Sequence, residues 1–189
     1  MWMAYYAALP LMPLSLAAAA YYTSPILIMV VAAAVTRCWP APRVLIAIFL
    51  GFTGVVLILR PDAASFDVAT LLPVLAAFLY ACDMVLTAQQ CRGDDPFALA
   101  LALNIAFIVA GAGLAIFSGQ EGSFIFGPWQ SLDLVLFGAI AALAAVILIG
   151  SVGAAFAYQN GPPATIAAFD YSYLVFSLIW GALFFGELP

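Results

Sequence analysis

The chain has 189 residues, of which 68% are hydrophobic and only 7% are charged. A soluble domain carries about 25% charged residues, so this composition excludes a soluble globular protein and indicates an integral membrane protein. The net charge of −5 comes from scattered acids, and the chain has no Lys, no His and no basic run, which excludes a nucleic-acid-binding surface and imidazole chemistry.

The apolar runs predict an all-α, multipass transmembrane helical bundle. They are about 20 residues long, as a helix that crosses a bilayer requires, rather than the alternating runs of about 10 residues typical of an outer-membrane barrel. Residues 1–36 carry no charge, yet a single helix of that length would measure about 54 Å against a hydrocarbon core of about 30 Å. We therefore expect a break at Pro10 and Pro13, which leaves a short piece followed by a full span.

The remaining spans follow from the charged and Pro- or Gly-rich turns between the apolar runs. With the short piece at residues 1–9, six full spans are expected, over residues 13–36, 44–59, 68–90, 96–117, 131–158 and 163–189. In the first of these spans Pro25 frees a backbone carbonyl and is expected to kink the helix. The three cysteines, at positions 38, 82 and 91, have no spacing typical of a disulfide or a metal site.

Two carboxylates lie within the predicted spans, each with a tyrosine three residues away. Asp83 follows Tyr80, and Asp170 precedes Tyr173, so each pair is predicted to share one helix face. A charge inside a span costs about 2.5–3.5 kcal/mol on insertion scales, so it usually faces the protein interior or a wet cavity. One hypothesis is a cavity where both acids meet a cation, an amine or a proton; the other is that each acid caps backbone donors or lies near the interface.

Tyr22 and Ser24 flank the predicted kink in the first full span. They either line the same cavity or, in the case of Ser24, bond to a carbonyl of their own helix. The chain shows no nucleophile paired with a base, no phosphate-binding loop and no metal cluster, so we do not expect an enzyme. A weak internal repeat is also present, because a shift of 150 positions lays residues 13–39 over 163–189 without a gap and places Tyr21 on Tyr171. Such repeats are typical of transporters that bind their substrate where the halves meet.

Three stretches resemble EamA-type transporters of the drug/metabolite transporter superfamily. Residues 13–25 resemble the fourth helix of that family, residues 46–61 with their Arg60-Pro61 ending resemble the close of its first repeat, and residues 154–189 with Gly186-Glu187 resemble the eighth and ninth helices. The chain departs from the family at Thr36-Arg37, where a Gly-Glu pair is usual.

The resemblance implies part of a ten-helix fold built from two inverted repeats, with this chain covering helices 3 to 9 and incomplete at both ends. Residues 1–61 would be the end of the first repeat, and residues 62–189 the second repeat without its last helix. The implied function is export or exchange of a small polar metabolite or amine-bearing solute, by alternating access through a cavity between the repeats. The substrate-binding positions carried over are Tyr22, Ser24, Tyr80, Asp83, Asp170 and Tyr173.

The expected surroundings follow from the same interpretation. The chain is expected in the bacterial inner membrane, with the lipid bilayer and a small-molecule substrate as partners, and without a cofactor, a metal ion or a nucleic acid. A homo-oligomer is a further candidate assembly. The alternative function is a non-transporting membrane subunit or inactive fragment whose acids serve packing against partner helices.

Overall fold

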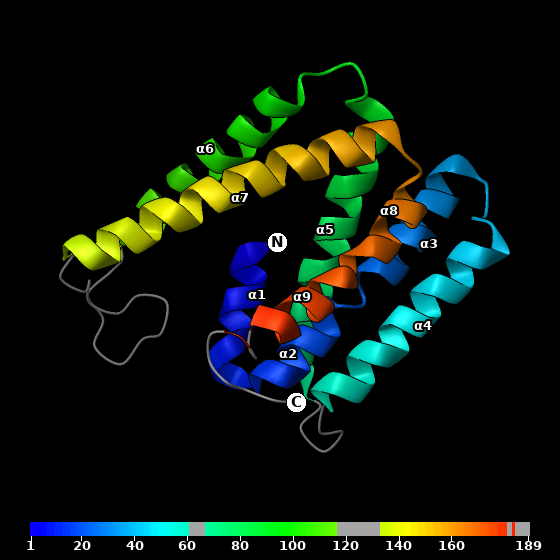
Figure 1. The fold of residues 1–189 in the computed structure, drawn as a ribbon, viewed down its shortest axis with the longest axis horizontal. Coiled ribbons are helices and arrows are strands. Elements are labelled where there is room, and N and C mark those ends of the chain that lie inside the picture. Colours follow the sequence, from blue (N-terminus) through cyan, green and yellow to red (C-terminus); the bar gives the residue numbers. More distant parts are fainter. Residues whose placement is uncertain (61–66, 117–132, 181–182, 184–189) are drawn as a thin grey trace. The chain divides into compact units, whose positions relative to one another are not determined.

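The structure is a computed structural model that describes residues 1–60, 67–116, 133–180 and 183. All regular elements in those residues are helical, which confirms the predicted all-α, multipass class (Figure 1). In chain order they are α1 (Trp2–Ala8), the short 3-10 helix η1 (Leu9–Leu11), α2 (Leu14–Tyr21), α3 (Ser24–Thr36), α4 (Pro42–Leu59), the 3-10 helix η3 (Val68–Thr70), α5 (Leu71–Gln90), α6 (Pro96–Ala115), α7 (Leu134–Asn160), α8 (Pro163–Asp170) and α9 (Ser172–Trp180).

The chain divides into two compact units. Unit 1 consists of Met1–Gln90 with Gly161–Pro189, and unit 2 is Cys91–Asn160. These units rest on spatial contacts, whereas the predicted repeats, residues 1–61 and 62–189, rest on sequence resemblance; the repeat division stays a prediction.

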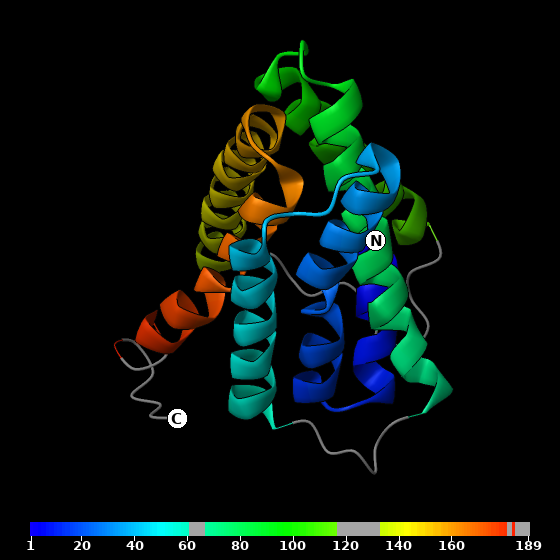
Figure 2. The same cartoon turned by 90° about the vertical axis from the view of Figure 1, so that its right-hand side faces the viewer.

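Unit 1 is organised around α3, which packs most extensively against α5 and α8. The buried side chains at these contacts are small or compact, so the helices approach closely, as is usual in membranes where packing rather than water exclusion drives association. The core residues on the two central helices are Ile28, Met29, Ala32 and Ala33 of α3 and Ala76, Ala77, Ala81, Met84, Val85 and Ala88 of α5. Figure 2 shows α3 continuing the direction of α2, with α4 and α5 alongside.

Proline positions explain the first two interruptions in the chain. The break expected at Pro10 and Pro13 is confirmed, because α1 ends at Ala8 and α2 begins at Leu14. The helix is also interrupted near Pro25, because α2 ends at Tyr21 and α3 begins at Ser24, with Pro25 in its first turn; the kink itself stays a prediction. Proline has no N–H to donate, and its ring crowds the carbonyl four residues back, so the helix restarts there.

The prediction of one continuous helix over residues 163–189 is wrong for the part that is described. α8 ends at Asp170 and α9 starts at Ser172, so the helix is interrupted at Tyr171. No proline lies at the interruption at Tyr171, which is why the sequence did not reveal it. Residues 181–182 and 184–189, including Gly186 and Glu187, lie outside the described residues.

The other helix bounds differ from prediction by only a few residues. α4 starts earlier, because Pro42 and Arg43 already belong to its first turn, and α7 extends through Asn160 into the predicted turn. The start of α5 is preceded by η3, where Asp67 and Thr70 form a capping box: the Val68 N–H donates to Asp67 at 2.6 Å, and the Asp67 N–H lies 3.3 Å from the Thr70 hydroxyl.

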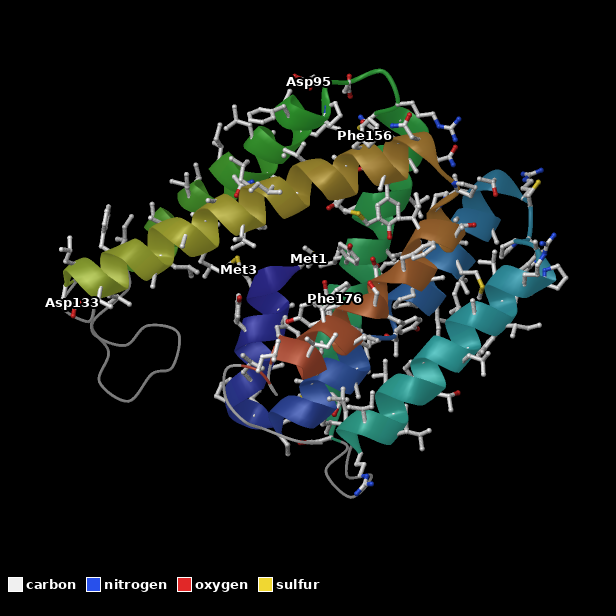
Figure 3. The ribbon with its side chains drawn as sticks, viewed as in Figure 1. Met1, Met3, Asp95, Asp133, Phe156 and Phe176 are labelled. Carbon is white, nitrogen blue, oxygen red and sulfur yellow. The ribbon has the colours of Figure 1, made fainter. Side chains whose placement is uncertain are left out.

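Unit 2 is a pair of packed helices, α6 and α7. An aspartate caps the first turn of each, and Figure 3 labels both. The Asp95 carboxylate accepts from the Phe97 N–H at 3.0 Å, and the Asp133 carboxylate accepts from the Leu136 N–H at 2.7 Å. A carboxylate suits this position because it satisfies an otherwise unpaired N–H and complements the positive helix end.

Among the residues described, five helical stretches are long and apolar enough to cross a membrane: Leu16–Thr36, Pro42–Leu59, Val68–Gln90, Pro96–Leu114 and Leu134–Asn160. The sixth predicted span, residues 163–189, is not among them, and residues 181–182 and 184–189 of it lie outside the described residues. These spans confirm that the protein is an integral membrane protein.

Candidate functional site

Seven of the eight tyrosines of the chain lie in unit 1 and make ring contacts there. We call this set the tyrosine cluster; its members are Tyr5, Tyr6, Tyr21, Tyr22, Tyr80, Tyr171 and Tyr173. Phenol rings combine an apolar face with a polar tip, so a cluster of them inside apolar helices forms a surface suited to flat, partly polar molecules.

One half of the cluster is built around Tyr21, the last residue of α2. Its ring centroid lies 5.2 Å from that of Tyr5 on α1, in an edge-to-face arrangement, and 6.2 Å from that of Tyr80 on α5. Tyr5 in turn contacts Tyr6 at 6.0 Å. Three helices therefore contribute rings to this half.

The other half is built around Tyr22, the next residue in the chain. Tyr22 is the residue that follows the last residue of α2, and its ring centroid lies 6.4 Å from that of Tyr173 and 6.5 Å from that of Tyr171. Both separations fall within the 4.5–7 Å that is usual for interacting aromatic rings. Because Tyr21 and Tyr22 are adjacent, the break after α2 joins the two halves.

Asp170 is the acid of this site. It is the last residue of α8, is half-buried, and lies close enough to interact electrostatically with the phenol groups of Tyr21 and Tyr22. A carboxylate beside a set of phenols supplies acceptor oxygens for the N–H and O–H groups of a solute.

The ring contacts bring together some of the sequence-predicted site residues. Tyr22 and Tyr173 face each other directly, Tyr80 joins through Tyr21, and Asp170 adjoins the same tyrosines. Tyr173 is 64% exposed, so its ring is accessible.

The ring contacts do not include Ser24 or Asp83. Ser24 is buried, 3% exposed, in the first turn of α3, and Asp83 is half-buried on α5, one turn beyond Tyr80. Their participation in the site stays a prediction.

Sequence reasoning missed three tyrosines that connect the cluster: Tyr5, Tyr21 and Tyr171. A signal for the last two was present, because the 150-residue shift superposes Tyr21 on Tyr171, and each lies at the interruption of its span. Tyr5 lies on a helix too short to span a membrane, and no pattern singles it out.

A groove also lies between α4 and α8. Apart from Arg43 and the Thr165 hydroxyl its lining is apolar, and its residues are Arg43, Val44, Ala47, Thr165, Ala168 and Phe169. This lining offers few polar groups with which to recognise a polar solute, so the tyrosine cluster is the better candidate site.

Fold and site together define an integral, multipass helical membrane protein with a cluster of tyrosine rings between its helices. Comparison with curated proteins finds bacterial transporters. The chain is 29% identical over 171 residues to a riboflavin transporter of Brucella anthropi, an alignment that covers 88% of this chain and 57% of that protein. It is 29% identical over 187 residues to a riboflavin transporter of Rhizobium johnstonii, covering 98% of this chain and 59% of that protein.

A third relative is a riboflavin transporter of Vibrio cholerae, 28% identical over 144 residues, with 76% of this chain and 45% of that protein covered. The chain thus spans about half the length of the curated relatives it matches. No protein-family model matches the chain, so its assignment to the EamA-type transporters stays a prediction. No solved structure matches either. The relatives and the spans together support the predicted location in the bacterial inner membrane.

Proposed function

We propose that this chain forms part of a membrane transporter that binds a flat, polar-edged heteroaromatic solute, with riboflavin as the first candidate. The observation that carries the proposal is the tyrosine cluster, in which rings from several helices of unit 1 gather beside the Asp170 carboxylate. The names of the relatives supply the particular solute.

The chemistry of the cluster suits such a solute. Stacking of a base-like ring on an aromatic side chain contributes about 1–3 kcal/mol per ring, as measured by alanine substitution in nucleic-acid-binding proteins. A hydrogen bond to a charged group contributes about 1.5–3 kcal/mol. Tyr22 and Tyr173 supply ring faces for the isoalloxazine system, and Asp170 accepts from an imide N–H or from the hydroxyls of the ribityl chain.

The proposal refines the solute class predicted from sequence. An amine-bearing solute would use Asp170 mainly as a counter-charge, whereas a neutral flat ring would draw most of its affinity from the tyrosines. Transport would proceed by alternating access, as the sequence predicts, with export or exchange as the expected direction.

The test measures riboflavin binding to the purified chain in detergent, by quenching of flavin fluorescence and by the rise in melting temperature that a ligand of the folded state produces. Tyr22→Leu removes a stacking ring and is expected to weaken binding about tenfold, which corresponds to about 1.4 kcal/mol. Tyr22→Phe keeps the ring and is the matched control, expected to bind within about twofold of the wild type.

Two results would reject the proposal. In the first, the wild type neither quenches flavin fluorescence nor gains melting temperature from riboflavin, while a cationic amine does stabilise it. That result would favour the amine-bearing class of solute. If neither solute stabilises the protein and native mass analysis finds it in a complex with other membrane proteins, the non-transporting subunit is favoured.

A further inference from the structure

The two interrupted spans of unit 1 contact one another at their interruptions. α2 gives way to α3 at Tyr22 and Thr23, and α8 gives way to α9 at Tyr171. The Tyr171 hydroxyl donates a hydrogen bond to the Tyr22 carbonyl oxygen at 3.3 Å, although the two residues are 149 positions apart. The interruptions also correspond in the internal repeat, where the 150-residue shift brings Tyr21 onto Tyr171.

The Tyr171 side chain occupies a slot that requires a glycine on α4. Tyr171 is buried, at 8% exposed, and belongs to a core cluster with Ile48 and Val55 of α4. Its ring lies against Gly51, where an added Cβ would be only 2.7 Å from Tyr171 Cγ. A larger residue at position 51 would therefore displace the ring.

The contacts of Tyr171 connect it to both of the proposed solute-binding rings. Its hydroxyl holds the backbone of Tyr22, and its own backbone is two residues from Tyr173. One buried residue, Tyr171, thus contacts the backbone of Tyr22 and lies two positions from Tyr173, whose ring is 6.4 Å from that of Tyr22.

We infer that Tyr171, seated on Gly51 and hydrogen-bonded to the Tyr22 carbonyl, is the positioning residue that sets the separation of the Tyr22 and Tyr173 rings. This inference rests on the proposed function for its effect on solute affinity, but the positioning itself can be measured without a solute. A binding site needs its contact groups held within about 0.5 Å of the productive geometry, so loss of the anchor lowers affinity without removing a contact group.

The first arm of the experiment measures riboflavin affinity. Tyr171→Phe keeps the ring but loses the hydrogen bond and is expected to weaken binding about three- to tenfold. Gly51→Ala displaces the ring and is expected to weaken it at least as much. Both changes disturb the same contact, so their effects should not add. The riboflavin affinity of the double variant should lie within about twofold of the lower of the two single-variant affinities.

Gly54→Ala is the matched control, because it adds the same methyl group to the same helix at a site where a Cβ would meet nothing within 4 Å. Gly54→Ala is expected to bind like the wild type. If Tyr171→Phe and Gly51→Ala bind riboflavin as the wild type does, or if they lower only the melting temperature, the inference is wrong.

The second arm needs no solute. In a background whose three native cysteines are replaced by serine, Tyr22→Cys is labelled with a thiol reagent, with and without Gly51→Ala. Displacement of the anchor should change the labelling rate of the half-buried position 22 by severalfold, and Gly54→Ala should leave the rate unchanged. Equal rates in all three backgrounds overturn the positioning claim. If riboflavin fails to bind the wild type, the proposed function fails and this arm alone decides the inference.

Discussion

The two compact units satisfy their polar side chains in different ways. In unit 2, the Asn104 amide donates to the Ala100 carbonyl at 2.7 Å and the Ser151 hydroxyl to the Ile147 carbonyl at 2.6 Å, each one turn back on the same helix. Unit 2 also has a longer-range bond, in which the buried Gln159 amide donates to the Cys91 and Asp94 carbonyls before α6. Unit 1 has such local bonds too, and its bond from the Tyr171 hydroxyl to the Tyr22 carbonyl joins two interrupted spans.

The difference indicates where a solute site can be built. A polar group satisfied by its own helix is able to face lipid, since it presents no unpaired donor or acceptor to the hydrocarbon. A polar group that depends on another helix has to stay inside the protein. In unit 1 this kind of bond, from Tyr171 to Tyr22, lies within the tyrosine cluster, where polar groups can also be shared with a solute.

The largest effect on riboflavin binding is expected from Asp170 of unit 1, and Asn104 of unit 2 serves as the comparison. Asp170→Asn replaces a charged acceptor with a neutral amide and is expected to weaken riboflavin binding roughly 10- to 100-fold, in line with about 1.5–3 kcal/mol for a hydrogen bond to a charge. Binding is measured by flavin fluorescence in detergent, with membrane expression checked alongside.

Asn104→Leu is the comparison variant, because the Asn104 amide donates to the Ala100 carbonyl of its own helix. It is expected to bind riboflavin within about twofold of the wild type. An Asp170→Asn variant that binds normally would remove the acid from the site, and an equal loss in Asn104→Leu would remove the distinction between the units.

A smaller effect is expected on stability. Ile28 of α3 is fully buried, at 0% exposed, whereas Ile149 of α7 is 72% exposed. Ile28→Ala leaves a cavity in the packing of unit 1 and should lower the free energy of unfolding by about 2 kcal/mol. Ile149→Ala makes the same chemical change at an exposed position and should alter it by less than about 0.5 kcal/mol. Thermal unfolding in one detergent measures both, and equal losses would contradict the assigned burial.

The smallest effect concerns the backbone at the end of α4 in unit 1. Arg60 adopts a left-handed conformation, with φ of 42°, as the residue that follows the helix. This conformation costs an L-residue about 1 kcal/mol and costs glycine almost nothing, although glycine also loses more entropy on folding. Arg60→Gly is therefore expected to raise stability by about 0.5 kcal/mol, seen as a small rise in melting temperature.

Arg43→Gly separates the backbone effect from the loss of charge. It removes the same side chain from a helical position in the first turn of α4, where glycine is unfavourable by about 0.5–1 kcal/mol. The melting temperature should fall in this variant. If both variants shift it in the same direction, the change reflects the lost charge instead of the left-handed backbone.

Part of the candidate site could be predicted from the sequence. The pairing of each acid with a tyrosine singled out Tyr80, Asp170 and Tyr173 among the residues that now border the cluster. The predicted kink at Pro25 singled out Tyr22. Tyr5 and Gly51 could not be singled out. A ring contact, or a slot for a ring, depends on which helices become neighbours, and a single sequence does not show which helices those are.

The sequence by itself determined that this is a helical membrane protein, because apolar composition and run length act residue by residue. It also determined the breaks at Pro10, Pro13 and Pro25, since proline disrupts a helix whatever surrounds it. Only the tertiary structure decided the interruption at Tyr171, where no proline occurs, and the contact of that residue with Gly51 and Tyr22. Such contacts join positions far apart in the chain, so they exist only once the helices have packed.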